Sequence, residues 1–270
     1  MSEELINKVL AEVVKKMGGD APAPSAAPAP APAPTPAAGT LPAVTEFVGT
    51  NVLGDTIGMV IANVDPKLRA MMKLEKDFRS IGILGARTGA GPHIFAADEA
   101  VKATNSEILT IELPRDTKGG AGHGSLIIFG AEDVSDARRA VEVALGELDR
   151  TFGDVYGNDA GHLEFQYTAR ASYALNKAFG APIGKAFGIT VGAPAGIGVV
   201  LADTAVKAAT VDVIGYASPA GGTSYSNEVI SFLSGDSGAV RQAIIAAREV
   251  GIPLLGALGA KPESTTTPYI

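Results

Sequence analysis

The chain has 270 residues, enough for two ordinary domains that each bury a core. Its 22 basic and 29 acidic residues give a formal net charge of −7, which supplies no positive surface for nucleic acid phosphates or an anionic membrane. The absence of cysteine excludes disulfides, thiolate metal sites, cysteine nucleophiles and iron–sulfur clusters. We therefore expect a cytoplasmic protein with neither nucleic acid nor a membrane as partner.

An amphipathic helix is predicted at residues 1–18. Its apolar residues recur every three to four positions, as the buried stripe of a helix requires. An isolated helix of this length is marginal in water, so the stripe needs a partner surface. The positions that define the stripe include Leu5, Ile6, Val9, Leu10 and Val13.

Residues 19–44 form a linker, and from residue 21 to 38 it is made almost entirely of alanine and proline. This composition offers no side chains for a core and favours extended polyproline segments. Apolar and β-branched residues return in short runs near Thr45, where we place the start of the globular sequence.

The globular sequence is an internal duplication, which is its most informative feature. AADEAVKATNSEIL in the first half matches LADTAVKAATVDVI in the second, so that Asp98 and Lys102 recur as Asp203 and Lys207. Further on, Phe129 and Arg138 recur as Phe232 and Arg241. The duplication predicts two homologous domains, at residues 45–156 and 157–270.

Each copy is predicted to be an α/β (α+β) unit, a small, mainly antiparallel sheet with flanking helices. In the first copy we expect helices at residues 66–76, 96–104 and 134–148. In the second copy we expect them at 172–178, 200–209 and 238–250.

The residues that usually carry chemistry show no catalytic or metal-binding pattern. Each of the three histidines, His93, His123 and His162, has a glycine within two positions and no second histidine or carboxylate at i+3 or i+4, so we expect loop or structural histidines. The glycine-rich segments lack the spacing of a phosphate-binding or dinucleotide-binding loop. We therefore expect no enzyme activity, no cofactor and no metal.

At this point the motifs show a family resemblance. ADEAVKAT, ADTAVKAA and GDSGAVRQA resemble the shell domain of bacterial microcompartments. The resemblance covers about residues 45–270, and the strand and helix before SIGILGA are similar to the circularly permuted tandem class of these shell proteins. Longer passages such as MKLEKDFRSIGILGARTGAGPHIFAADEAVKAT are similar to shell proteins of propanediol-utilization compartments. The resemblance implies a tile in a compartment shell, built as a homotrimer that imitates a hexamer, with other shell proteins as partners.

The resemblance also implies where the tile meets its neighbours, its metabolites and its cargo. Lys102 and Lys207 match the lysine that packs at tile edges. The helix at residues 1–18 is similar to the tags with which encapsulated enzymes dock to shells. Two loops match segments that line pores for small polar metabolites of the 1,2-propanediol or glycerol type. The expected pore residues are Lys118, Gly119, Gly120, His123, Ser125, Gly221, Gly222, Thr223 and Ser224.

Other functions stay open on sequence grounds. The compartment could process another substrate, such as ethanolamine or ethanol. A duplicated small-molecule-binding regulator is a further alternative, and it would remain a discrete oligomer, whereas a tile would assemble into sheets or closed shells.

Overall fold

The computed structural model describes residues 44–74, 76–115 and 123–270, which belong to one compact unit. The predicted helix with Leu5, Ile6, Val9, Leu10 and Val13, the linker up to residue 43, and Lys118, Gly119 and Gly120 lie outside the described residues.

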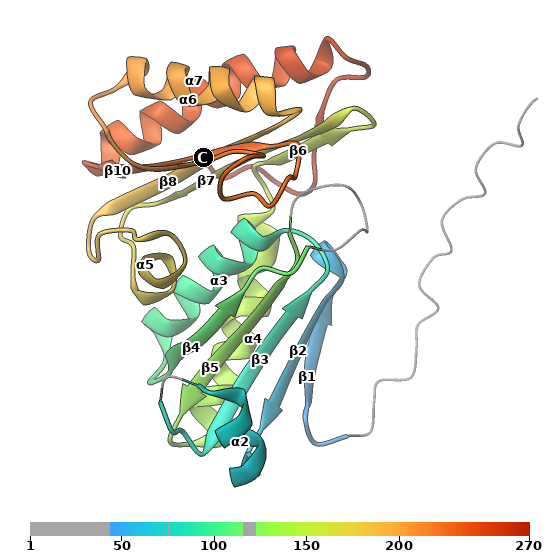
Figure 1. Ribbon diagram of the computed structural model, residues 1–270, viewed down its shortest axis with the longest axis vertical. Helices are drawn as coiled ribbons and strands as arrows, with labels where there is room; N and C mark the ends of the chain where they lie inside the picture. The colour runs from blue at the N-terminus through green and yellow to red at the C-terminus, as the bar shows by residue number, and fades with distance from the viewer. Residues whose placement is uncertain (1–43, 75, 116–122) are drawn as a thin grey trace, which may run out of the picture. The chain divides into compact units, whose positions relative to one another are not determined.

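The first domain contains five strands and the helices that cover them (Figure 1). The sheet has the order β1-β2-β3-β5-β4, with antiparallel pairing throughout. Its elements are β1 (Phe47–Asn51), the 3-10 turn η1 (Leu53–Asp55), β2 (Thr56–Ile61), α2 (Pro66–Met72), β3 (Ser80–Ala86), α3 (Ala90–Ala103), β4 (Glu107–Glu112), β5 (Ser125–Ala131) and α4 (Val134–Thr151).

The second domain repeats this arrangement, with sheet order β11-β6-β7-β8-β10-β9. Its pairing is also antiparallel, and the short strand β11 is added at the edge beside β6. Its elements are β6 (Val155–Asn158), β7 (Gly161–Thr168), α5 (Tyr173–Phe179), β8 (Ala186–Ala193), α6 (Ala195–Ala208), β9 (Asp212–Ala217), β10 (Val229–Gly235), α7 (Ser237–Gly256) and β11 (Glu263–Ser264).

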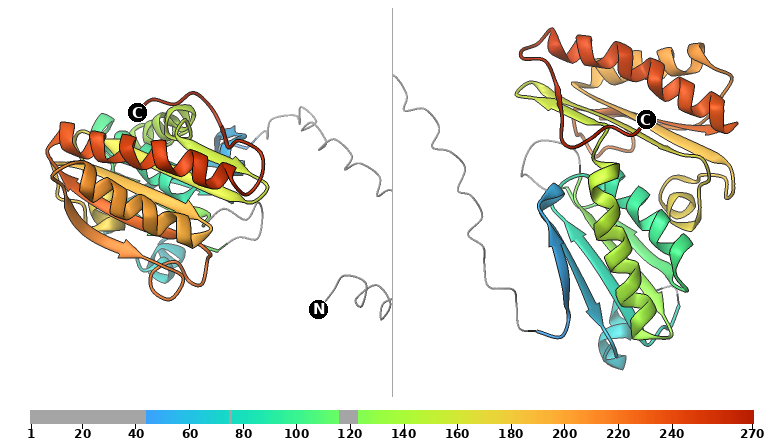
Figure 2. Two further views of the ribbon diagram at one scale, coloured as in Figure 1. Left: turned by 90° about the horizontal axis from the view of Figure 1, so that it is seen from above. Right: turned by 180° about the vertical axis from the view of Figure 1, so that it is seen from behind.

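Long helices cover one face of each sheet. Helices α3 and α4 pack together on the first sheet, and α6 and α7 on the second, as Figure 2 shows from two further directions. The aligned helices α3 and α6 therefore occupy equivalent places in the two domains. The observed architecture agrees with the predicted fold class.

The two domains share a continuous apolar core. Buried residues of α3 pack with buried residues of α5 and β8 in one cluster. Within it the rings of Phe95 and Phe187 stack with centroids 5.9 Å apart, and Phe179 and Phe232 extend the stack. Burial of large aromatic rings dominates the stability of such contacts, so the seam between the domains is a structural core.

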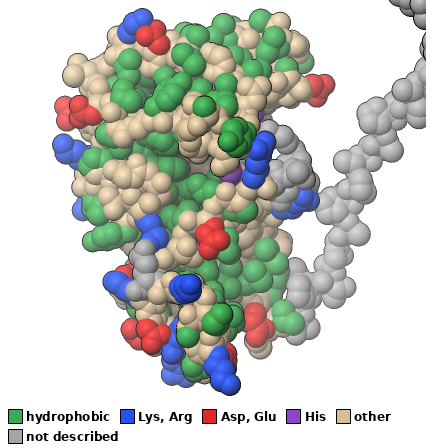
Figure 3. Space-filling view, viewed as in Figure 1, with side chains coloured by type: hydrophobic (Ala, Val, Ile, Leu, Met, Phe, Trp, Pro, Cys, Tyr) green, Lys and Arg blue, Asp and Glu red, His purple; other side chains and the backbone are tan. Residues whose placement is uncertain are grey.

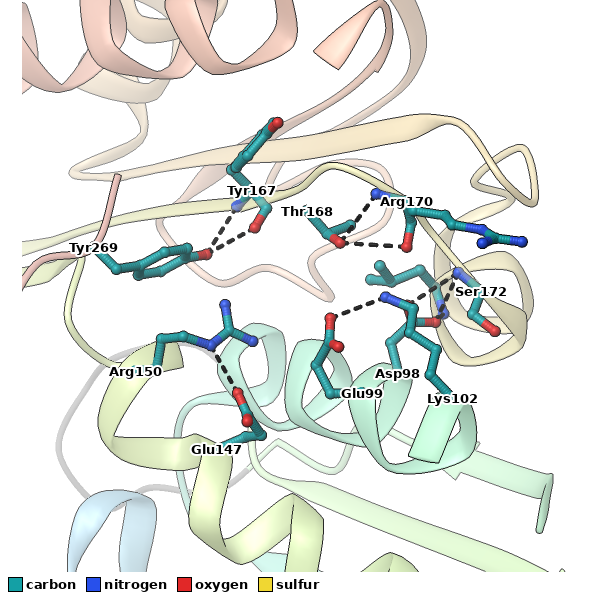
Figure 4. Close-up of polar contacts among 11 residues, drawn as sticks. Asp98, Glu99, Lys102, Glu147, Arg150, Tyr167, Thr168, Arg170, Ser172 and Tyr269 are labelled. Carbon is teal, nitrogen blue, oxygen red and sulfur yellow. Dashed lines mark hydrogen bonds and ion pairs between the residues drawn. The ribbon is translucent and has the colours of Figure 1, made fainter. Parts of the chain in front are cut away.

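Polar contacts fix the orientation of the seam (Figure 4). The buried carboxylate of Asp98 on α3 accepts hydrogen bonds from the backbone amides of Ser172 (3.0 Å) and Leu175 (3.2 Å), at the start of α5. Lys102 lies 2.9 Å from the same carboxylate. Burial raises the pKa of Asp98, although Lys102 and the two amides oppose that shift. An acid of one domain thus caps a helix of the other.

The C-terminal residues are tied to the junction between the domains. Asp154, fully buried after α4, accepts hydrogen bonds from the amides of Tyr269 (2.9 Å) and Ile270 (3.1 Å). Arg248 of α7 donates to the same carboxylate at 2.6 Å. The hydroxyl of Tyr269 donates to the carbonyl of Tyr167 at 2.9 Å, which connects this segment to β7.

Some helix boundaries differ from the prediction. Helix α3 begins at Ala90 and α6 at Ala195, several residues before the predicted starts at 96 and 200. Gly89 takes a left-handed conformation (φ 84°) as the N-cap of α3, and Pro92 lies in the first turn, where its missing N–H costs no helical hydrogen bond. Residues that resemble helix breakers therefore start this helix.

Candidate functional site

A cavity of about 940 Å³ lies between the two domains. Residues of both domains line it, including the loop before α3, the end of α4, and strands β6 and β7. Most of its wall is apolar, with Phe152, Phe179 and Ile189 among the lining side chains. Apolar walls with a few convergent polar groups are typical of small-molecule sites.

The two loops predicted to line pores meet at this cavity. His123 from the first domain and Gly222 and Ser224 from the second contribute to its lining. Arg115, just before the undescribed part of the first loop, donates a hydrogen bond to the carbonyl of Ser224 at 2.7 Å. Two loops far apart in the sequence are thus connected across the seam.

The structure places the other described residues of the predicted pore set away from the cavity wall. Thr223 is fully buried, and its hydroxyl donates to the carbonyl of Ser226 at 3.2 Å. Ser125 is buried at the start of β5, and Gly221 closes a turn through backbone hydrogen bonds with Ser218. Within this loop, Ser224 and Tyr225 both have positive φ, a conformation that costs about 1 kcal/mol for residues other than glycine.

The polar centre of the cavity is a cluster of two acids and two imidazoles. Glu228, just before β10, is buried and lies 3.4 Å from His162 Nε2 and 3.6 Å from His123 Nδ1. Burial would raise the pKa of Glu228, but the contacts of His123 and His162 outweigh it and lower the pKa to about 2. Glu228 is therefore ionised at neutral pH.

The second acid, Glu164 on β7, has a different protonation state. Burial, together with the charge of Glu228, raises the pKa of Glu164 to about 8, so this carboxyl group is mostly neutral at pH 7. Its carboxyl group lies against the first turn of α3, where a Cβ at position 91 would overlap Oε1 of Glu164. Glycine at 91 is required for this close approach.

Unpaired oxygen atoms make the cluster suitable for a ligand. Among the described residues, Glu164 Oε1 and Glu228 Oε1 are buried and have no hydrogen-bond partner. Leaving a buried polar atom unpaired costs about 1–3 kcal/mol, which a bound hydroxyl or ammonium group would recover. Glu164, Glu228 and the role of His162 were missed in the sequence, because β7 and the loop before β10 meet only in the folded chain.

His93 has a structural role, as the sequence suggested. It is buried, with Nε2 2.6 Å from the hydroxyl of Thr56, and its Nδ1 donates to the carbonyl of Gly89 at 2.6 Å. Burial lowers the pKa of His93 to about 4, although the Gly89 carbonyl opposes this shift. This histidine is therefore neutral at physiological pH, and it anchors the start of α3 to β2.

The two predicted edge lysines have different surroundings. Lys102 pairs with Asp98 and Glu99 beside the seam, and its side chain is 25% exposed. Lys207 pairs with Asp203 at 2.7 Å on α6, and its side chain is 72% exposed.

Among residues 44–74, 76–115 and 123–270, no group of three or more His, Asp or Glu side chains is placed to hold a metal ion. No helix in these same ranges is long and apolar enough to cross a membrane.

The fold and the cavity define a class: a protein with two copies of one permuted α/β domain, in which one copy covers a helix of the other. Comparison with known proteins identifies the domain. The model of the BMC domain matches residues 80–158 and 186–259. The chain belongs to the family of bacterial microcompartment shell proteins, and its role is that of a structural shell protein.

Relatives resemble the chain over its whole length. The chain is 63% identical over 269 residues to the bacterial microcompartment shell protein PduB of Citrobacter freundii, an alignment that covers 100% of this chain and 99% of the relative. A crystal structure of a trimeric PduB shell protein is 55% identical, with a TM-score of 0.82, and covers 84% of this chain and 100% of that chain. EtuB from Clostridium kluyveri is 58% identical, with a TM-score of 0.81, and covers 85% of this chain and 100% of that one. These matches confirm the family and the fold inferred from the duplicated motifs.

Proposed function

We propose that three copies of the chain join into a ring of six homologous domains, that these rings tile the shell of a cytoplasmic microcompartment, and that small polar metabolites pass through the cavity in each copy. The proposed role is structural, without catalysis. The observation that carries the proposal is a difference in burial between two aligned helices. Helix α3 is buried inside the chain, whereas one apolar face of α6 is exposed.

The aligned positions of the two helices differ strongly in burial. Ile94 and Phe95 of α3 are buried, whereas their counterparts Val199 and Val200 of α6 are 49% and 42% exposed. Figure 3 shows hydrophobic side chains gathered over this part of the second domain. Contiguous exposed apolar surface of this kind marks an interaction site.

The first domain offers a matching surface. In the second domain, α5 and β7 cover α3, and their counterparts in the first domain are α2 and β2. The exposed residues there include Leu68 (50%) and Met71 (77%) on α2, and Ile57 on β2. A second copy that sets its α2 and β2 on α6 would repeat the seam between chains, and repetition of a single heterologous contact gives a ring when its rotation closes. The trimeric PduB structure supports three as the number of copies.

The rim of the ring is where tiles would meet one another and other shell proteins. The proposed edge lysines are Lys102 and Lys207. Lys207, exposed beside Asp203, has the reach and freedom of a contact residue.

The cavity between the domains is the proposed route for metabolites of the 1,2-propanediol or glycerol type. His123, Gly222 and Ser224 line it, and unpaired oxygen atoms in its wall suit hydroxyl groups. The same proposed pore loops also contain Lys118, Gly119, Gly120, Ser125, Gly221 and Thr223. The second candidate is a compartment for another substrate, such as ethanolamine or ethanol.

The N-terminal segment is the proposed attachment for encapsulated enzymes. Its stripe of Leu5, Ile6, Val9, Leu10 and Val13 would lie in an apolar groove of a cargo protein, as amphipathic helices do. Deleting residues 1–40 should abolish co-purification of cargo with the shell while tiles still form. Unchanged cargo attachment would exclude this role.

Electron microscopy of the purified full-length protein tests the proposed function. Sheets, tubes or shells built of three-fold tiles are expected. A discrete oligomer that never assembles further would favour the regulator.

A further inference from the structure

The cavity between the domains has a smaller neighbour, and the two share part of their walls. The smaller cavity, of about 130 Å³, is lined by Ala193, Pro194 and Asn227 among others. Gly161, His162 and Glu228 line both cavities. His162 and Glu228 therefore present side chains to both cavities, whereas Gly161 has none.

Glu228 contributes a negative charge to this shared wall, and its neighbours hold it in place. Glu228 has a buried side chain, 3% exposed, between two imidazoles, with His162 Nε2 at 3.4 Å and His123 Nδ1 at 3.6 Å. Its Oε1 is the atom 3.6 Å from His123 Nδ1, too far for a hydrogen bond, and it has no closer partner among the described residues. A second acid beside it, Glu164, is mostly uncharged at pH 7, because burial and the charge of Glu228 raise its pKa to about 8.

This inference rests on the proposed passage of metabolites through the chain, and it adds a selection rule. We propose that Glu228, positioned by His123 and His162, is a charge-selective constriction between the two cavities, which admits neutral hydroxyl compounds and small cations and turns anions away. A hydroxyl or ammonium group can donate to Oε1 of Glu228, which accepts no hydrogen bond from the described residues, whereas a carboxylate cannot donate and is repelled by the charge. Within a buried site this repulsion is screened far less than in water.

Three probes of nearly equal size separate charge from shape: propane-1,2-diol, 1-aminopropan-2-ol and lactate. The chain has 3 histidines, so the full-length protein labelled at the histidine Cε1 carbon gives few signals in nuclear magnetic resonance. Two of the three histidines contact Glu228, and buried His93 serves as an internal reference. At pH 7 the diol and the amine should shift the signals of His123 and His162 at concentrations at least tenfold below those that lactate requires.

Matched variants assign the effect to one carboxylate. Glu228→Gln removes the charge with little change of shape, and it should bring the affinity for lactate to within about threefold of that for the diol and weaken amine binding about tenfold, or ~1.4 kcal/mol. Glu164→Gln replaces a group that is already neutral and should leave the order of the three affinities unchanged. Glu249→Gln, on the exposed face of α7, is the control for a general loss of charge.

The outcomes separate this inference from the proposed passage. If no probe shifts His123 or His162 in the unsubstituted protein, the passage itself is contradicted. If all three probes bind with equal affinity, or if Glu228→Gln leaves their order unchanged, the cavity still binds metabolites but the constriction has no charge selectivity.

Discussion

Helices α3 and α6 carry nearly the same sequence motif and have opposite surroundings. In α3, Asp98 is buried and caps α5 of the other domain, while in α6 the aligned Asp203 is exposed and pairs with Lys207. At the helix start, Gly91 contacts Glu164, whereas its counterpart Gly196 has open space in the described structure. The two helices differ in what covers them: α5 and β7 cover α3, whereas nothing in the described part of the same chain covers the equivalent face of α6. One chain thus has two such helices and two such covering surfaces, but forms the contact once.

The comparison also explains why the seam within the chain, between α3 and α5, depends on a polar cap. The proposed contact between copies, of α6 with α2, does not need one. Helix α5 lacks a side-chain cap of its own and takes one from Asp98. Helix α2, its counterpart, is capped by its own Asp65, which accepts from the amides of Lys67 (2.9 Å) and Leu68 (3.1 Å). A contact between α6 and α2 of another copy would therefore be mainly apolar.

The largest effect is expected from a charge on the bare face of α6. Val199→Asp should abolish assembly, because burying an unpaired carboxylate in a contact between copies costs several kcal/mol. The separate chain should remain folded, because Val199 is exposed there. Sedimentation and circular dichroism measure the two properties. Val134→Asp, at another exposed valine at the start of α4, is the control and should assemble normally.

The next effect separates the two aligned acids. Asp98→Ala should lower the free energy of unfolding by about 3 kcal/mol, since it removes a helix cap and leaves the Lys102 ammonium without its buried partner. In the separated chain, Asp203→Ala should lower it by less than about 0.5 kcal/mol, the value of an exposed ion pair. Urea unfolding measures both. Equal losses would mean that the two helices have equivalent surroundings.

A pH effect distinguishes Glu164 from its counterpart in the first domain, the apolar Ile57. The pKa of Glu164 is about 8 in the folded chain and 4.5 as an ordinary glutamate, so the folded state binds more protons between these values. Stability should therefore fall as pH rises, by about 2 kcal/mol between pH 6 and pH 8. Glu164→Gln should remove this decrease. An identical decrease in the variant would show that another group is responsible.

The smallest effect concerns the two lysines. Lys102→Ala should destabilise the chain by about 1 kcal/mol, because it leaves the buried Asp98 without a counter-charge. Lys207→Ala should change stability by at most about 0.3 kcal/mol. Thermal unfolding of both variants under identical conditions provides the comparison, and a larger effect at Lys207 would reverse it.

Features encoded locally could be predicted from the sequence. The duplicated motifs gave the two domains their order of strands and helices, because apolar periodicity reflects which face of each element is buried. The starts of α3 and α6 were placed too late, since Gly89, Gly91 and Pro92 have low helix propensity but are compatible with a helix N-terminus.

The candidate site was only partly predictable. The loops with His123 and Ser224 were identified, but the acids that give the site its charge were not. Glu228 stands alone in a small-residue loop, and its position between two imidazoles depends on contacts over more than one domain. One feature of the sequence could have indicated Glu164: it is a single acid within the apolar and aromatic strand LEFQYT. A buried carboxylate in such a strand is a frequent mark of a functional site.

The central claim is that the surface of α6 is completed by the first domain of another copy, and a cross-linking measurement tests it most directly. The chain has no cysteine, so the double variant Ile57→Cys, Gly196→Cys carries thiols solely at the counterparts of the contacting pair Glu164 and Gly91. Mild oxidation should link three chains into a closed ring, seen as a single band at three times the chain mass without reductant. The double variant Val134→Cys, Gly196→Cys is the control and should not form this band. If the first pair links no better than the control pair, the claim is contradicted.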